Sequence, residues 1–275
     1  SNTLKQDGTT IEAVAGDISN YEVVQKLIDR DDISVFHLAS VVSGSGEKNF
    51  DLAMNVNLDG GRNIMEAVRR RATCPRLVFA SSIAVFGGAS MAPIVGDLAK
   101  QTPQTTYGVT KAISELLIND YTRKGFLDGR SARLPHVIIR PGKPNAAASG
   151  FASAIFREPL NGIDYQVPVA PDTPMPILGY RAIIEGLDSM ILGDDRAVGL
   201  PSHTVTAADM VKAVTVYDKD RKLGKITFNP DPFILDIINT WPLDAEWKRA
   251  RELNFPIDGG LEQIIDHFLD DYLNV

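Results

Sequence analysis

Residues 77–82 have the sequence LVFASS, four apolar residues followed by two serines. A short, continuous apolar run is typical of a strand that is buried on both faces, as in a parallel sheet. The serines then fall at the carboxyl end of the strand, where open α/β sheets bind their ligands. This segment therefore predicts both a parallel sheet and the edge of it that carries a site.

Two more segments have the pattern of the 77–82 strand, and helical patterns lie between them. Strands are expected at Val35–Ala39 and Val137–Ile139. Helices are expected over 21–29, 50–71 and 107–124, where apolar residues recur at helical spacing. Because such crossovers are right-handed, the order predicts an α/β fold with a Rossmann-like, doubly wound parallel sheet.

The pattern changes after about residue 143. Prolines cluster at 168, 171, 174 and 176, and loops separate the remaining helices. This shift predicts a dinucleotide-binding domain over 1–143 and a smaller C-terminal substrate lobe over 144–275, with elements exchanged between them where packing requires it.

The N-terminus departs from the expected domain. A dinucleotide-binding domain begins with a strand and a Gly-rich turn that leads into a helix and holds the pyrophosphate. Residues 1–8 read SNTLKQDG and contain neither, so we expect that the first strand and turn are absent from this sequence. The first strand expected is 12–15, which would place Asp17 at the sheet edge.

Composition restricts the function classes. The 275 residues carry 28 basic and 35 acidic side chains, for a net charge of −7, which argues against a nucleic-acid or membrane-surface partner. The single cysteine suits a reducing compartment, and one cysteine with four histidines gives no metal-ligand cluster. Without a signal peptide or spanning apolar run, we expect a soluble cytoplasmic protein.

Tyr107 and Lys111 lie four residues apart at the start of a predicted helix, which puts them on one face. A nearby ammonium lowers the pKa of a phenol and makes it a general base for an alcohol. Ser82, 25 residues earlier, can then hold the same oxygen. The alternatives are a solvated helix pair and a serine that caps a turn.

Other polar residues admit two interpretations each. Asp17 can accept a hydrogen bond from an adenine amino group, or cap a helix. The segment 38–40 (LAS) lets a flat cofactor approach the backbone, although core packing also favours alanine there. Asn57, in the middle of a predicted helix, either bridges elements or is exposed.

Six motifs occur in the order found in one family: 16–18 (GDI), 37–39 (HLA), 57–60 (NLDG), 81–87 (SSIAVFG), 107–111 (YGVTK) and 140–142 (RPG). They resemble the extended short-chain dehydrogenase/reductase family, which contains NAD-dependent epimerases and dehydratases, over residues 11–160. The blocks 125–129, 139–151 and 157–160 are most similar to the D-erythronate dehydrogenases, which use NAD to oxidise four-carbon sugar acids.

The resemblance implies a mechanism. Tyr107 would take the proton of the C2 hydroxyl while hydride leaves C2 for NAD. Lys111 would lower the Tyr107 pKa and bind the ribose, and Ser82 would hold the reacting oxygen. Asn57 would support a proton-relay water or only its helix.

The resemblance also implies binding residues and partners. The expected cofactor contacts are Asp17, Ile18, Leu38, Ala39, Ser40, Asn57, Ser81, Tyr107, Lys111, Pro141 and Lys143. The expected sugar-acid contacts are Ser43, Ser82, Asn145, Ser149 and Arg157, with Arg157, Lys143 and Ser149 as candidates for the carboxylate. A homodimer through the helices at 50–71 and 107–124 is expected as well.

Two other functions remain open. A nucleotide-sugar epimerase or reductase would share the catalytic trio but would need a nucleotide platform in the C-terminal lobe. A non-catalytic binding protein on a degenerate dehydrogenase scaffold would account for the absent Gly-rich turn.

Overall fold

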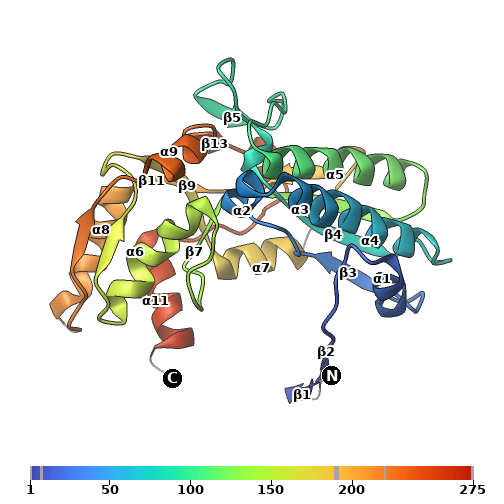
Figure 1. The fold of residues 1–275 in the computed structure, drawn as a ribbon, viewed down its shortest axis with the longest axis horizontal. Coiled ribbons are helices and arrows are strands. Elements are labelled where there is room, and N and C mark those ends of the chain that lie inside the picture. Colours follow the sequence, from blue (N-terminus) through green and yellow to red (C-terminus); the bar gives the residue numbers. More distant parts are fainter. Residues whose placement is uncertain (1, 7–8, 189–191, 220, 274–275) are drawn as a thin grey trace.

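The segment 77–82 lies in β4 (Arg76–Ser82), a central strand of a four-stranded parallel sheet in this computed structural model (Figure 1). The strand order is β10 (Ala197–Gly199), β6 (Asp128–Leu134), β4 and β3 (Ser34–His37). The structure describes residues 2–6, 9–188, 192–219 and 221–273.

Helices cover both faces of this sheet. Leu77 and Phe79 pack against α1 (Tyr21–Leu27), α4 (Gly60–Arg69) and α5 (Thr106–Arg123). Val78, which points the other way because side chains alternate along a strand, packs against α7 (Tyr180–Asp188) and α10 (Lys248–Glu252). The continuous apolar run follows from this two-sided burial, and the predicted doubly wound α/β fold is confirmed.

The helix predicted over 50–71 is present but irregular. It consists of α3 (Phe50–Ala53), a π-helical segment η1 (Met54–Asp59) and α4, and α2 (Ser43–Lys48) precedes it. Asn57 lies in the π-helical segment, a deviation that is frequent at functional sites.

A second sheet and a separate apolar core form the C-terminal lobe. β7 (His136–Ile138) is parallel to β9 (Pro174–Gly179), which pairs antiparallel with β11 (His203–Thr206). The remaining elements are β5 (Ile94–Gly96) with β13 (Asp244–Glu246), β8 (Tyr165–Val167) with β12 (Ile226–Phe228), the helices α6 (Phe151–Leu160), α8 (Ala207–Thr215), α9 (Pro232–Ile238) and α11 (Leu261–Tyr272), and the turns η2 (Ile83–Val85), η3 (Ala148–Gly150) and η4 (Val216–Lys219).

The strand predicted at 137–139 does not belong to the main sheet. The third strand of that sheet is β6, whose sequence DGRSARL contains three charged residues, and 137–139 falls in and just after β7 of the second sheet. The charges of β6 are tolerated because they are paired: Arg130 Nη2 lies 2.6 Å from Asp128 Oδ2, and Arg133 Nη2 lies 2.9 Å from Glu115 Oε2. An apolar run was therefore the wrong criterion for this strand.

The strands of the N-terminal segment also differ from those predicted, both in their positions and in their pairing. Asn2–Gln6 does form a strand, β1, and it pairs antiparallel with β2 (Thr9–Ala13). This hairpin extends away from the body of the molecule (Figure 1), and β2 pairs with no strand of the parallel sheet. The strand expected at 12–15 consequently does not bring Asp17 to the sheet edge.

The two halves of the sequence exchange elements. β10, from the second half, is an edge strand of the parallel sheet beside β6. β7, from the first half, pairs with β9 of the second sheet. The division after residue 143 remains a prediction, and any such division has to account for these two strands.

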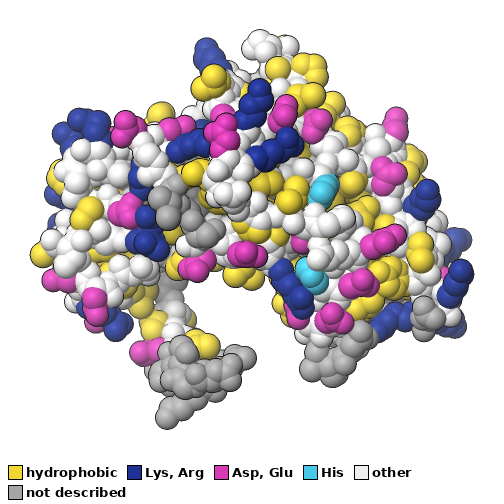
Figure 2. All heavy atoms as spheres, turned by 180° about the vertical axis from the view of Figure 1, so that it is seen from behind, with side chains coloured by type: hydrophobic (Ala, Val, Ile, Leu, Met, Phe, Trp, Pro, Cys, Tyr) yellow, Lys and Arg dark blue, Asp and Glu magenta, His cyan; other side chains and the backbone are white. Residues whose placement is uncertain are grey.

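In Figure 2, acidic and basic side chains are interspersed on the visible face, and basic residues do not gather into one area. Among the described helices, none is long and apolar enough to cross a membrane.

A buried ion pair joins α5 to β6. Glu115 receives hydrogen bonds from Arg133 Nε and Nη2, from Ser81 Oγ of β4 and from Gln101 Nε2. The side chains of Glu115 and Arg133 are only 2% and 10% exposed. Removing one partner of such a pair leaves an uncompensated buried charge.

We therefore expect Glu115→Ala to lower the free energy of unfolding by about 3–5 kcal/mol. The control is Asp120→Ala, on the same helix, which removes the exposed Asp120–Arg123 pair and should cost less than about 1 kcal/mol. Urea denaturation of the three proteins measures both values. Equal losses for the two variants would contradict a structural role for the buried pair.

Candidate functional site

The two serines that end β4 serve different purposes. The Ser81 hydroxyl donates to Glu115 in the buried network. Ser82 accepts a hydrogen bond from Ala84 N at 3.1 Å, which caps η2, and it lines the same cavity as Tyr107, whose pKa it lowers. The alternation of side chains along the strand explains why only Ser82 reaches Tyr107.

A glycine brings Tyr107 to Ser82. The hydroxyl of Thr105 caps α5 by accepting from Gly108 N at 3.1 Å. A Cβ atom at Gly108 would lie 2.1 Å from the carbonyl oxygen of Ala84 and 2.9 Å from Cβ of Pro103. Only glycine allows the first turn of α5 to pack this closely on η2, so the distance between Tyr107 and Ser82 depends on residue 108.

The pKa of Tyr107 has opposing influences. Burial raises it, and this is the largest effect; the hydrogen bond with Ser82 and the charge of Arg140 lower it. The net direction is upward, opposite to the lowering expected from Lys111. The cation that favours the phenolate in this structure is Arg140.

Lys111 lies one turn below Tyr107 and is buried. Its Nζ donates to the carbonyl of Ala80 at 2.7 Å and lies 4.6 Å from the Phe79 ring centroid and 5.4 Å from that of Tyr107. Burial lowers the pKa of Lys111 to about 7, and Glu115 opposes this shift.

Asn57 fixes the loop that follows β3. Its Oδ1 accepts from Val41 N at 2.7 Å and from Ser40 Oγ at 3.1 Å, and its Nδ2 donates to Val41 O at 3.0 Å and to Thr110 Oγ1 at 3.3 Å. These bonds occupy the whole amide, so Asn57 connects this loop to α5. Of its two predicted roles, the structural one fits these contacts.

Two adjoining cavities contain most of the predicted site residues. The catalytic cavity, of about 210 Å³, is lined by eight of them: Leu38, Ser40, Ser43, Ser81, Ser82, Tyr107, Lys111 and Ser149. The adjoining cavity, of about 260 Å³, is lined by four: Pro141, Lys143, Asn145 and Arg157. Arg140 and Ala147 line both cavities and thus lie between them.

Three predicted residues lie outside both cavities besides Asn57: Asp17, Ile18 and Ala39. The Asp17 carboxylate is exposed and accepts from Ser19 N at 2.9 Å and from Ser19 Oγ at 2.8 Å, bonds that lower its pKa. Here Asp17 is a turn residue. The backbone at Ile18 is held by Asn63, whose Nδ2 donates to the Ile18 carbonyl at 3.0 Å.

Arg157 is already paired. Its Nη2 lies 2.6 Å from Glu158 Oε1, and its Nη1 donates to the Arg140 carbonyl at 3.0 Å. Both bonds make Arg157 a support for the segment at residue 140 rather than an open partner for a substrate carboxylate.

Three residues with nitrogen-bearing side chains line the catalytic cavity but were not predicted as site residues from the sequence: His136, Arg140 and Trp241. Arg140 belongs to the quoted RPG motif but was given no role. Its position just after the apolar run 137–139 could have suggested a cation at the site. Nothing local in the sequence marks His136 or Trp241, because their proximity depends on how distant segments pack.

The cavity mouth suits the nicotinamide end of a dinucleotide. Leu38 is 58% exposed there. Ser40 follows β3, and Ala80 lies near the carboxyl end of the neighbouring parallel strand β4. Lys111 donates one hydrogen bond to Ala80, which leaves N–H groups for the hydroxyls of a ribose. These residues can hold a flat ring and its sugar.

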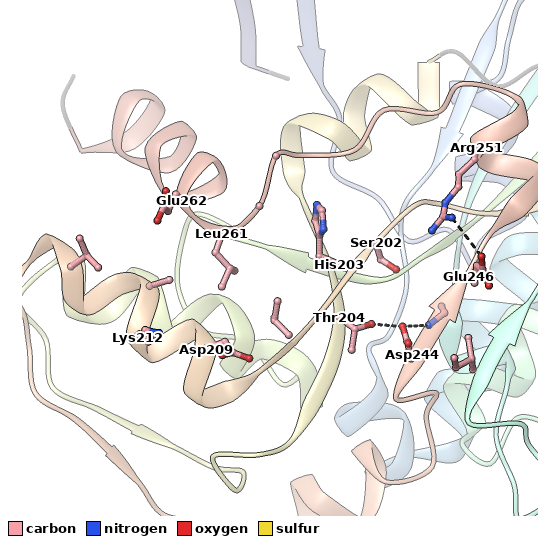
Figure 3. A pocket seen from close by; sticks show the side chains of 17 residues that line it. Ser202, His203, Thr204, Asp209, Lys212, Asp244, Glu246, Arg251, Leu261 and Glu262 are labelled. Atoms are coloured by element: carbon pink, nitrogen blue, oxygen red, sulfur yellow. Dashed lines mark hydrogen bonds and ion pairs between the residues drawn. The ribbon is translucent and has the colours of Figure 1, made fainter.

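A third cavity, of about 760 Å³, lies in the C-terminal lobe and contains none of the predicted residues (Figure 3). Its polar side chains largely satisfy one another: Thr204 is hydrogen-bonded to Asp244, Arg251 is paired with Glu246, and Asp209 belongs to the capping box of α8. Size alone therefore does not make it the site.

Comparison with known proteins gives consistent results. The model of the NAD dependent epimerase/dehydratase family matches residues 1–172. A D-erythronate dehydrogenase from Cupriavidus necator is 44% identical over 271 residues, which are 96% of this chain and 83% of that protein. A D-erythronate dehydrogenase from Haemophilus influenzae is 38% identical, with coverage of 90% and 80%.

Solved structures share the fold. A nucleoside-diphosphate-sugar epimerase from Agrobacterium tumefaciens superposes with a TM-score of 0.88 and 37% identity, covering 99% of this chain and 83% of that one. An L-threonine dehydrogenase from Phytophthora infestans gives a TM-score of 0.81 and 26% identity, with coverage of 94% and 84%.

The contact at Gly108 leads to a prediction. Gly108→Ala should move the first turn of α5 and reduce kcat by about 10²-fold, the loss expected for a displacement of about 1 Å. Gly46→Ala is the control, because its Cβ would meet only ordinary contacts, the nearest at 3.6 Å. If steady-state kinetics showed the same small change for both variants, the close approach would not position Tyr107.

Burial of Lys111 predicts a pH dependence of stability. The folded pKa is about 7 against an ordinary 10.5, so the unfolded chain binds more protons between these values and stability rises with pH in this window. Relative to Lys111→Met, the unfolding free energy of the wild type should increase by up to about 1.4 kcal/mol per pH unit. Urea denaturation across the window measures this. Parallel curves for the two proteins would show that the pKa is not depressed.

Proposed function

The chain belongs to the NAD-dependent epimerase/dehydratase family, and from that premise we propose that it oxidises the C2 hydroxyl of a four-carbon sugar acid such as D-erythronate to the 2-oxo acid. Its relatives make it an NAD-dependent oxidoreductase that acts on CH–OH groups. Identity of 44% over nearly the whole chain supports the sugar acid as the substrate class.

The observation that carries the proposal is one cavity lined by Tyr107, Ser82 and the buried Lys111, in which Ser82 lowers the pKa of the Tyr107 phenol. A phenol and a hydroxyl that line one cavity can both contact the same substrate oxygen. A general base placed in this way contributes about 10²- to 10⁴-fold to a rate.

In the proposed reaction, Tyr107 acts as the phenolate and takes the proton of the C2 hydroxyl. Ser82 donates a hydrogen bond to the same oxygen as it becomes a carbonyl. A bound NAD would supply the acceptor for the hydride of C2. Loss of the hydroxyl proton and of the C2 hydride converts the 2-hydroxy acid into the 2-oxo acid.

Lys111 serves the cofactor end of the cavity in this proposal. With its ammonium held at the Ala80 carbonyl, its remaining N–H groups face the ribose hydroxyls. Leu38 and Ser40 flank the ring, and Ser43 and Ser149 contact substrate hydroxyls.

A homodimer through the helices of residues 50–71 (α3, η1 and α4) and 107–124 (α5) remains part of the proposal. Exposed apolar side chains on these helices support it: Phe50 is 60% exposed and Leu116 is 63% exposed. Such side chains are candidates for burial between two copies.

A nucleotide-sugar epimerase is the second candidate, favoured by the likeness to the Agrobacterium structure. It would use the same Tyr107 and Ser82. A nucleotide would have to occupy the adjoining cavity, which is lined by Arg140, Lys143 and Arg157.

The test is oxidation of a panel of sugar acids, followed by NADH absorbance, together with conversion of UDP-sugars, followed by chromatography because epimerisation produces no net NADH. D-Erythronate should be oxidised, UDP-glucose and UDP-galactose should not be converted, and Tyr107→Phe should lower kcat by about 10²- to 10⁴-fold. Ser82→Ala should shift the pH profile of kcat/KM to higher pH, because the bond that Ser82 makes lowers the pKa of Tyr107.

Conversion of a UDP-sugar without oxidation of any four-carbon acid would overturn the assignment in favour of the epimerase. Turnover of D-erythronate by Tyr107→Phe at the wild-type rate would overturn the mechanism but not the substrate.

A further inference from the structure

Three polar side chains of the catalytic cavity have no part in the proton transfer described above: His136, Arg140 and Trp241. Each has a buried nitrogen without a hydrogen-bond partner in the described part of the chain, namely His136 Nε2, Arg140 Nε and Trp241 Nε1. An unpaired buried polar group costs about 1–3 kcal/mol. The three residues that carry these atoms line one cavity, which makes a polar ligand in it a candidate partner for them.

Arg140 makes this cavity attractive to an anion. No acidic side chain among the described residues pairs with its guanidinium, and burial together with the charge of Arg157 lowers its pKa. Arg157 differs, because Glu158 neutralises it. Arg140 is thus a guanidinium without an acidic partner, and it lies between the two cavities.

The position of Arg140 suits a carboxylate next to the reacting carbon. Arg140 lines the same cavity as Tyr107, and its charge lowers the pKa of Tyr107. In a 2-hydroxy acid, the carboxylate carbon is bonded directly to the carbon that carries the hydroxyl. A side chain that binds this carboxylate must therefore lie beside the base, as Arg140 does.

His136 and Trp241 offer complementary groups. His136 Nδ1 lies 2.9 Å from the Pro176 carbonyl oxygen, which only accepts, so Nδ1 carries the hydrogen and Nε2 is an acceptor. Burial lowers the pKa of His136 to about 4, which keeps the ring neutral. The indole of Trp241, 5.5 Å away between ring centroids, can only donate.

We propose that Arg140 and Trp241 bind the carboxylate of the substrate and that His136 accepts a hydrogen bond from the C3 hydroxyl. This inference rests on the proposed oxidation of a sugar acid and names the residues that would recognise that acid. Arg140 then replaces Arg157 and Lys143 as the carboxylate partner. Together the three side chains determine the specificity for polyhydroxy acids over neutral polyols.

The first experiment compares D-erythronate with erythritol, which has a neutral CH₂OH in place of the carboxylate. Arg140→Met should lower kcat/KM for D-erythronate by about 100-fold or more, as expected for truncating a buried charge partner, and change that for erythritol by less than about 3-fold. Arg140→Lys should be intermediate, because lysine keeps the charge but not the bidentate geometry. All values are taken on the pH plateau of each variant, since Arg140 also affects the pKa of Tyr107.

Equal losses on both substrates would overturn the proposal, because a structural defect affects acid and polyol alike. His136→Phe gives an independent comparison with 2-hydroxybutyrate, which lacks the C3 and C4 hydroxyls. It should lower kcat/KM for D-erythronate by about 10-fold and leave that for 2-hydroxybutyrate within about 3-fold. A uniform change would exclude His136 as the acceptor.

Binding measured by calorimetry separates this inference from the proposed function. In the presence of NADH, which prevents oxidation, Arg140→Met should raise the Kd of D-erythronate by about 100-fold and leave the Kd of NADH unchanged. A weaker NADH complex with unchanged D-erythronate binding would assign Arg140 to a cofactor phosphate and overturn the inference. Absence of D-erythronate binding to the wild type would overturn the proposed function as well, whereas Arg140-dependent binding without turnover would overturn the proposed reaction alone.

Discussion

The arrangement of the site depends on one steric constraint, the approach of α5 to the turn that follows β4. At Gly108 the helix backbone lies so close to the Ala84 carbonyl that a Cβ would be 2.1 Å away. This approach places Tyr107 at Ser82 and, one turn later, Lys111 at the Ala80 carbonyl. One turn further, Glu115 anchors the helix to Arg133 of β6. Steric contact at one end and a buried ion pair in the middle thus prevent the helix from sliding along the sheet.

Elements whose stability is local or purely apolar could be predicted from the sequence. The strand 77–82 and the helices at 21–29 and 107–124 correspond to β4, α1 and α5. β6 could not be identified by an apolar run, because its buried arginines are paired with carboxylates: Arg130 with Asp128 of the same strand and Arg133 with Glu115 of α5. Asp17 was misplaced because β2 pairs with β1 rather than with the parallel sheet.

The same distinction applies to the candidate site. Tyr107, Lys111 and Ser82 are connected by helix and strand geometry, which a spacing rule can express, and all three line the catalytic cavity. His136 and Arg140 reach that cavity from one segment, β7 and the residues just after it, and Trp241 reaches it from the segment after α9. Only the packing of β7 against β9 and of the segment after α9 brings them together. The pattern within one segment does not indicate which distant segment packs against it.

The exchange of strands between the two halves has a consequence for how this architecture can change. β10 completes the parallel sheet from beyond residue 190, and β7 completes the second sheet from before residue 143. Neither half can then be replaced by recombination at a single point without removing a strand from the other. New substrate preferences in such a chain arise more readily by substitution of residues in the cavity wall than by exchange of a whole lobe.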